Sequence, residues 1–254
     1  MKTKLLSTVV ATALLGLSGT ASAYMTFFGE DLNNSATVPL SSTPNSSAKE
    51  ANFKAQLTGV STETFESQTT GASAPLALNF SGSLTATLTG GGTVAAVTPG
   101  TTNGYGRYSI PSASSSKYWE VDAGSFEIEF SGAIAAFGFY GVDVGDFGGQ
   151  VSIDFYNGTS LINSIDVPHT IVSTTSTDGS VLFFGAIASS AAEEFTSVRF
   201  RTTYGSGDVF AFDNFTIGAR DQVIPPTNPT PIPGTLLLAG LGLAGLGAMR
   251  RRAR

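Results

Sequence analysis

Two aspartates in a glycine-rich stretch have the residue types and spacing of a cation site. Asp143 and Asp146 lie three residues apart in FGFYGVDVGDFGGQ, the stretch from Phe137 to Gln150. Carboxylates together with backbone carbonyl oxygens are the ligands that hard cations such as calcium prefer. The same pattern also favours a plain turn, because aspartate next to glycine caps turns with no ion present. The stretch therefore predicts either a calcium site or a tight turn.

An aromatic pair suggests a second kind of site. Trp119, the only tryptophan, follows Tyr118 in KYWEVD, directly after a serine-rich turn and before a predicted strand. We expect both side chains to be partly exposed, where their rings could stack on a sugar. Tyr105 and Tyr108 lie upstream and would support such a platform. The alternative is ordinary packing in the core or at its rim.

Catalytic patterns are weak in this sequence. His169, the only histidine, follows a proline and is typical of a loop, and no serine lies in a nucleophile setting such as GxSxG. Glu127 and Glu129 could be the acid and nucleophile of a glycosidase. Residues two apart on a strand share one face, however, and the apolar residues around them fill the other, so we expect both glutamates to face water. We predict a non-enzymatic protein, with a secreted glycoside hydrolase-like enzyme as the alternative.

Charge and cysteine content exclude several classes of partner and site. Six of the 13 basic residues lie at the two ends of the 254-residue chain. The body then holds seven basic residues against 19 acidic ones, which leaves about −12. Such a body should not bind nucleic acid. Cysteine is absent, which excludes disulfides, thiolate metal sites and a cysteine nucleophile.

The middle of the chain has the pattern of an antiparallel β-sandwich or jelly roll. FEIEF (126–130) and SVRFRTT (197–203) alternate apolar with polar residues, as strands with one buried face do. Asn157-Gly158 predicts a hairpin with a type I′ turn. Nine short strands at a spacing of about ten residues predict an all-β fold. The runs are 76–80, 83–88, 126–130, 134–140, 151–156, 160–165, 181–184, 197–203 and 210–217.

The sequence divides into five segments. The β-sandwich domain is expected over 56–222, after a Ser/Thr/Asn-rich segment over 24–55 in which Ser41 to Glu50 has the composition of a loop. Order should begin near Phe53, and a short helix is expected at Ala188 to Phe195. A proline-rich linker over 223–235 leads to the last segment, 236–254.

The N-terminus has the pattern of a secretory signal peptide. Lys2 and Lys4 precede an apolar run from Leu5 to Leu17, and small residues at 21–23 follow it. This order of positive head, apolar middle and small-residue exit predicts a signal peptide over residues 1–23, which is removed on export. The mature chain would begin at Tyr24.

The C-terminus predicts a short transmembrane helix. Leu236 to Met249 is free of charge and would span about 21 Å as an α-helix, whereas a bilayer core takes about 20 residues. Arginines follow at once and should hold this end on the cytoplasmic side of the inner membrane, with the body outside. A plain anchor that is never cleaved is the alternative to a sorting helix.

This combination of proline motif, apolar helix and arginine cluster resembles the PEP-CTERM sorting signal of Gram-negative bacteria. The residues that match are Pro231, Ile232, Pro233, Gly234, Arg250, Arg251 and Arg252. The resemblance implies an exosortase-type processing enzyme as partner, release at the cell surface or outside the cell, and an association with exopolysaccharide and biofilm. The usual Pro-Glu-Pro is here Pro231-Ile232-Pro233, so the acidic residue is missing.

A second resemblance covers two strands of the body. TETFES (62–67) and FAFDNFTIG (210–218) are similar to the opening and closing strands of extracellular jelly-roll, carbohydrate-binding-like modules. In such modules an acidic residue from each strand helps to hold a structural calcium, which here implies Glu66 and Asp213. Together these patterns predict an exported surface or extracellular-matrix protein, and they leave open whether it binds exopolysaccharide or is a purely structural matrix component with no ligand.

Overall fold

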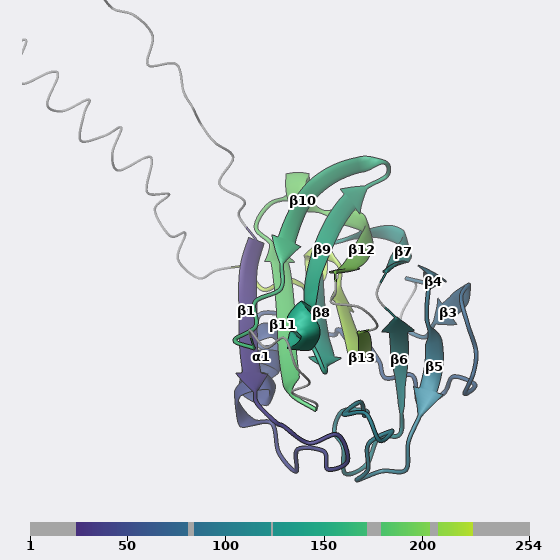
Figure 1. Ribbon diagram of the computed structural model, residues 1–254. Coiled ribbons are helices and arrows are strands. Elements are labelled where there is room, and N and C mark those ends of the chain that lie inside the picture. Colours follow the sequence, from purple (N-terminus) through teal and green to yellow (C-terminus); the bar gives the residue numbers. More distant parts are fainter. Residues whose placement is uncertain (1–23, 81–83, 123, 172–178, 204–207, 226–254) are drawn as a thin grey trace, which may run out of the picture. The chain divides into compact units, whose positions relative to one another are not determined.

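The computed structural model describes residues 24–80, 84–122, 124–171, 179–203 and 208–225. The predicted signal peptide, sorting motif and C-terminal helix lie outside these residues. Within them, the chain up to Val223 forms one compact unit of two stacked antiparallel sheets (Figure 1), which confirms the β-sandwich. The described part of the chain contains no helix with the length and apolar character needed to span a bilayer.

One sheet has seven strands. Its order is β1 (Tyr24–Asp31), β11 (Val181–Ala188), β8 (Ala136–Val142), β13 (Val209–Gly218), β6 (Lys117–Asp122) and β5 (Thr93–Ala96). The short strand β2 (Ser61–Glu63) also pairs with β13. The strands β1, β2, β5 and β6 were not among the nine predicted runs.

The other sheet has six strands. Its order is β10 (Ser160–Asp166), β9 (Gln150–Asn157), β12 (Phe195–Thr203), β7 (Ser125–Ile134), β4 (Ala86–Gly90) and β3 (Leu76–Leu78). All nine predicted runs are strands of the two sheets. In β7 buried and exposed side chains alternate, as expected for a sheet with one face in the core.

Phenylalanine rings fill the space between the sheets. Phe126 and Phe200 come from neighbouring strands of the six-stranded sheet and stack with ring centroids 4.3 Å apart. Phe139 and Phe212 from the seven-stranded sheet contact this pair, with ring centroids 4.9 to 5.2 Å from it. The large apolar rings thus provide the core that a cysteine-free sandwich needs.

The seven-stranded sheet is buried on both faces. Along β11, Phe184 points between the sheets, whereas Phe183 lies in a second apolar cluster on the outer face. Helix α1 (Pro44–Lys54) packs on this outer face against β1, β11 and β8. The ring of Phe53 fits there because Gly138 and Gly185 have no side chain: a Cβ would come within 2.9 and 2.7 Å of the ring.

The prediction that order begins near Phe53 is wrong, because Tyr24–Asp31 is already a strand and most of the expected loop Ser41–Glu50 is helical. Helix α1 begins with Pro44, whose missing N–H costs nothing at a first helical position. The carboxylate of Asp31 accepts hydrogen bonds from the free backbone N–H groups of Asn45 at 3.0 Å and Ser46 at 2.8 Å. The helix therefore takes its N-terminal cap from β1, which sequence composition does not reveal.

Two turns differ from expectation in detail. The β9–β10 hairpin is confirmed, but Asn157 pairs with Ser160, so the turn residues are Gly158 and Thr159, with Gly158 at φ 57°. Residues 188–195 form no α-helix; β11 ends there, a 3-10 turn η2 (Ala191–Glu193) follows, and β12 begins. The other 3-10 turns are η1 (Asp146–Gly148) and η3 (Arg220–Gln222).

Phe53→Ala should lower the free energy of unfolding by about 3–5 kcal/mol, because it leaves a cavity under α1 that the glycine-lined sheet cannot fill. Urea unfolding at pH 7 measures this change. Leu32→Ala is the control, since the Leu32 side chain is 60% exposed and should change the stability by less than about 0.5 kcal/mol. Equal stabilities of the two variants would contradict the packing described for Phe53.

Candidate functional site

The outer face of the six-stranded sheet is available for binding, unlike that of its partner sheet. Helix α1 and the loop from residues 97 to 116 cover the outer cluster of the seven-stranded sheet. On the six-stranded sheet, the outward side chains of β4, β7 and β10 are exposed to solvent or half-buried. We call the outward side chains of β4, β7, β12, β9 and β10 the open face.

Strand register arranges the open face in three rows. The first contains Thr87, Glu129, Ser197, Tyr156 and Leu161. The second contains Thr89, Glu127, Arg199, Asp154 and Ser164. The third contains Ser125, Arg201, Ser152 and Asp166. Each row crosses the strands, so neighbouring members lie one strand apart.

Arg199 and Glu127 are fixed across β12 and β7. The Nε and Nη2 atoms of Arg199 donate to Oε2 of Glu127 at 3.0 and 2.9 Å. The other carboxylate oxygen, Oε1, accepts a hydrogen bond from the Ser197 hydroxyl at 2.5 Å. Both oxygens of Glu127 are therefore engaged. As expected from the sequence, Glu127 and Glu129 lie on the solvent side of β7.

Arg201 and Asp154 form a two-pronged pair across β12 and β9. Nε and Nη2 of Arg201 donate to the two oxygens of Asp154 at 2.6 and 2.9 Å. The hydroxyl of Ser164 on β10 also donates to Asp154 at 2.6 Å. The hydrogen bond from Arg201 is the main reason that the pKa of Asp154 lies below its usual value, and burial opposes it. Asp154 thus stays ionised at neutral pH.

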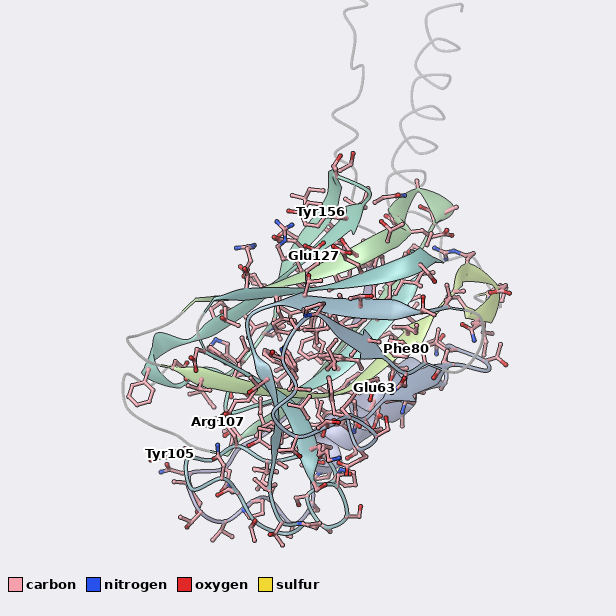
Figure 2. All side chains as sticks on the ribbon, turned by 90° about the vertical axis from the view of Figure 1, so that its right-hand side faces the viewer. Glu63, Phe80, Tyr105, Arg107, Glu127 and Tyr156 are labelled. Atoms are coloured by element: carbon pink, nitrogen blue, oxygen red, sulfur yellow. The ribbon has the colours of Figure 1, made fainter. Side chains whose placement is uncertain are left out.

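Tyr156 and Leu161 give the first row an apolar end. The guanidinium carbon of Arg199 lies 4.9 Å from the centroid of the Tyr156 ring, a cation–π contact. Leu161 pairs with Tyr156 across the β9–β10 hairpin and is 54% exposed. Figure 2 shows Tyr156 and Glu127 close together on one side of the molecule, with Tyr105 and Arg107 at the opposite side.

The open face combines groups that suit polyhydroxylated ligands. The side chains of Arg199 and Arg201 are each 43% exposed, and among the described residues neither Nη1 atom has a partner. The hydroxyls of Ser197, Ser164 and Ser152 already donate to carboxylates, whereas those of Thr87, Thr89 and Ser125 on the same face can donate or accept hydrogen bonds. Because ion pairing fixes both arginines, the donors are pre-positioned. An aromatic ring and a leucine at one end add an apolar contact area.

The structure corrects the aromatic prediction. Trp119 and Tyr118 are both fully buried, because KYWEVD is strand β6 between β13 and β5. Trp119 points between the sheets and stacks near Phe65 at 6.3 Å. Tyr118 lies in the outer apolar cluster, and burial raises its pKa. Neither ring can stack on a sugar in this structure.

Asp143 forms an ion pair with an arginine. Its left-handed backbone angle, φ 67°, fits the predicted turn. Its Oδ2 accepts a hydrogen bond from Arg107 at 3.3 Å, and Oδ1 accepts one from the Gly179 N–H at 3.1 Å. The side chain of Asp146 lies outside the described part. Among the described residues, no three His, Cys, Asp or Glu side chains lie together as a possible metal site.

Glu66 and Asp213 both hold the segment from Ser109 to Lys117 against the sheets. Asp213 accepts hydrogen bonds from the Ser109 hydroxyl and the Ile110 N–H at 2.8 and 2.7 Å. Complete burial raises its pKa well above the usual range, against the opposing effect of these bonds. Glu66 accepts hydrogen bonds from the N–H groups of Ser116 and Lys117, both at 2.7 Å. Burial alone would raise the pKa of Glu66, but these bonds outweigh it and lower the pKa.

Lys117 places a positive charge beside two backbone oxygens near Glu66. The Nζ atom of Lys117 donates to the backbone oxygens of Glu66 at 2.9 Å and Gln68 at 2.6 Å. Carbonyl oxygens of this kind would complete the oxygen shell of a calcium ion. Calcium binding at Asp143 and Asp146, or at Glu66 and Asp213, stays a prediction of the sequence.

We did not predict Arg199, Arg201, Asp154 or Tyr156 as site residues, although the alternation of their strands is visible in the sequence. FEIEF and SVRFRTT were recognised as half-exposed strands, and VSIDFY alternates in the same way. What the sequence does not give is that β12 lies between β7 and β9. Only this strand order places Arg199 and Arg201 beside carboxylates 72 and 47 residues away.

Arg201→Gln should destabilise the protein by about 1 kcal/mol at pH 7, a low value because Arg201 is 43% exposed and water screens the pair. The pKa of Asp154 is lower in the folded protein than in the unfolded chain, where it is about 3.9. The stabilisation by the Arg201–Asp154 pair is therefore present above about pH 3.9 and is lost as the pH falls through the pKa of the folded state. Urea unfolding at pH 7, 5 and 3 should show the difference between wild type and variant shrinking towards pH 3. A difference that grows on acidification would contradict the assigned pair.

Comparisons with known proteins assign no family to the chain. No protein-family profile matches the sequence, and no functionally characterised protein matches it. Among solved structures, the K2 cleaved adhesin domain of Lys-gingipain is 17% identical, with 63% of this chain and 97% of that chain covered and a TM-score of 0.39.

Two further structures are similar at lower scores. A cyclase from Fischerella sp. TAU is 13% identical over 54% of this chain and 77% of its own, with a TM-score of 0.33. A family 11 carbohydrate-binding module of a Clostridium thermocellum cellulase is 11% identical over 63% and 95%, with a TM-score of 0.27. At these values the likenesses support no functional argument.

Proposed function

We propose that this chain is an exported, non-enzymatic surface or extracellular-matrix protein that binds polysaccharide through the open face. The observation on which this depends is the arrangement of Arg199, Arg201 and Tyr156 on neighbouring strands of the exposed sheet. Ion pairing fixes the two guanidinium groups while leaving donors directed to solvent. Sugars present hydroxyls that pair with such donors and apolar ring faces that pack on aromatic rings.

The size of the open face also supports a polymeric ligand. Its first two rows cross five strands at about 4.8 Å per strand, which gives a width of roughly 20 Å. A single sugar would contact only a part of this area, whereas a chain of sugars could contact a whole row. Many modest contacts along a chain would then add to a useful affinity.

A glycoside hydrolase is the competing function, and the carboxylates of the open face do not favour it. Such an enzyme needs one carboxylic acid with a raised pKa facing a second carboxylate across the substrate. Asp154 instead has a lowered pKa and is paired with Arg201. Glu127 has both oxygens engaged by Arg199 and Ser197. These groups are suited to hold arginines in place more than to transfer protons.

Export and sorting are supported by the two ends of the sequence. The pattern of residues 1–23 is that of a signal peptide, and the segment from Pro231 to Arg254 resembles a PEP-CTERM signal. We infer that an exosortase-type enzyme processes the C-terminus while the inner membrane holds the apolar helix. The mature protein would then reach the cell surface or the medium, where exopolysaccharide is its partner.

Tyr156→Ala should weaken retention on the polysaccharide that retains the wild type by about 5- to 10-fold, since aromatic contacts contribute about 1 kcal/mol or more. Affinity gel electrophoresis with a panel of polysaccharides measures this. Tyr105→Ala is the matched control, because Tyr105 is 69% exposed but lies away from the open face. Equal losses for both tyrosines, or retention by none of the panel, would argue against the open face as the binding surface.

Intact-mass measurement of the cell-surface form tests the sorting proposal. The expected mass is that of a chain which begins at Tyr24 and lacks Arg250, Arg251 and Arg252, because both terminal segments are removed. A Pro231→Ala, Pro233→Ala double variant should keep the C-terminal segment and stay in the inner-membrane fraction. A surface form that retains the terminal arginines would overturn exosortase processing.

A further inference from the structure

A polar groove adjoins the open face at the third row. It encloses about 270 Å³, near the lower end of the range for small-molecule pockets, about 300 Å³. Its walls are the turn Gly91–Thr93, the end of β6 at Glu120–Asp122, and Gly124–Ser125. The function proposed above makes no use of this groove.

Ser125 joins the groove to the open face. On the sheet it pairs with Arg201 on β12, and in the groove it forms part of the wall. Its carbonyl oxygen accepts a hydrogen bond from the N–H of Gly91 at 3.2 Å, so the two sides of the groove are tied together. Ser125 is therefore the residue that the third row and the groove share, at the edge where β6 ends and β7 begins.

The groove offers fixed hydrogen-bond acceptors. Glu120 alternates with Trp119 and Val121, which point between the sheets, so its carboxylate lies on the outer side of β6. Arg107 Nε holds it at 2.9 Å and Asn103 Nδ2 at 3.1 Å, both to Oε2. Asp122 at the end of β6 is exposed. Glycines on the opposite side leave the backbone accessible. Carboxylates in fixed positions are good acceptors for the hydroxyl groups of a sugar.

The charge of the whole surface restricts the ligand. On the open face four carboxylates (Glu127, Glu129, Asp154 and Asp166) stand against two arginines, and each arginine is already paired with one of them. The groove adds Asp122 and Glu120, of which Glu120 is paired with Arg107. An anionic polysaccharide would therefore meet net repulsion along its path, whereas an uncharged one would not.

We propose that the groove is a further subsite of the polysaccharide-binding surface and that it takes an uncharged sugar residue. This inference rests on the proposed function, since it extends the same surface beyond the third row. The ligand class is then a neutral polysaccharide, and the groove residues Gly91 to Thr93 contribute to affinity.

Gly91 allows the groove to be filled without disturbing the fold. It is not among the residues with a positive φ, and a Cβ there would lie 3.8 Å from both Ser125 O and Val121 Cγ2, an ordinary contact distance. Gly92 would be unsuitable, because its Cβ would meet the Trp119 ring at 2.5 Å. Gly91→Phe should therefore block the groove, and Gly91→Ala is the matched control that leaves it open.

The test uses affinity gels with neutral polysaccharides (mixed-linkage β-glucan, galactomannan and xylan) and acidic ones (alginate and polygalacturonate), together with melting temperatures of all variants. We expect only neutral polysaccharides to retain the wild type. Retention should be about tenfold weaker for Gly91→Phe, which corresponds to the loss of one sugar contact, and it should be unchanged for Gly91→Ala. Equal melting temperatures would show that both variants are folded.

The other outcomes separate the two proposals. If Tyr156→Ala weakens retention while Gly91→Phe behaves as the wild type, the groove is no subsite and the open face still binds. If alginate or polygalacturonate is retained as strongly as the neutral polymers, the neutral ligand class is wrong. If no polysaccharide retains the wild type, the proposed function fails and the groove assignment fails with it.

Discussion

The ring of Phe53 packs against Gly138 and Gly185, and the arrangement of the molecule depends on this contact. It seats α1 on the outer face of the seven-stranded sheet, where Tyr140 and Phe183 would otherwise meet water. With one outer face covered in this way, the outer face of the six-stranded sheet is left to solvent. The difference between the two sheets thus follows from hydrophobic burial. The seven-stranded sheet is apolar on both faces, whereas the six-stranded sheet can be polar on its outer face.

The positions of the side chains on the open face are set by strand register more than by any single residue. Arg199 and Arg201 lie on β12, the strand between β7 and β9, so each has carboxylates within reach on neighbouring strands. A shift of one residue in β12 would turn both arginines into the core and Phe200 out to solvent. The aromatic core therefore fixes the register, and the register fixes the geometry of the open face.

Sequence patterns predicted the sheets better than they predicted the site. Short apolar or alternating runs identified nine strands, and the alternation in FEIEF predicted the outward direction of Glu127 and Glu129. Both are local features of the sequence. The burial of Trp119 was not local, since it follows from the insertion of β6 between β13 and β5. The cap of α1 by Asp31 and the pairing of Arg201 with Asp154 likewise join residues distant along the chain, which one sequence does not place together.

The three rows of the open face are chemically unequal, and this has a consequence for any linear molecule lying over them. Tyr156 and Leu161 make the side of the first row apolar, whereas Arg201, Ser152 and Asp166 make the side of the third row hydrophilic. Such a surface has no two-fold symmetry in its chemistry. A polysaccharide whose two ends differ would therefore make different contacts in its two orientations. The open face would then select the direction of the sugar chain as well as its composition.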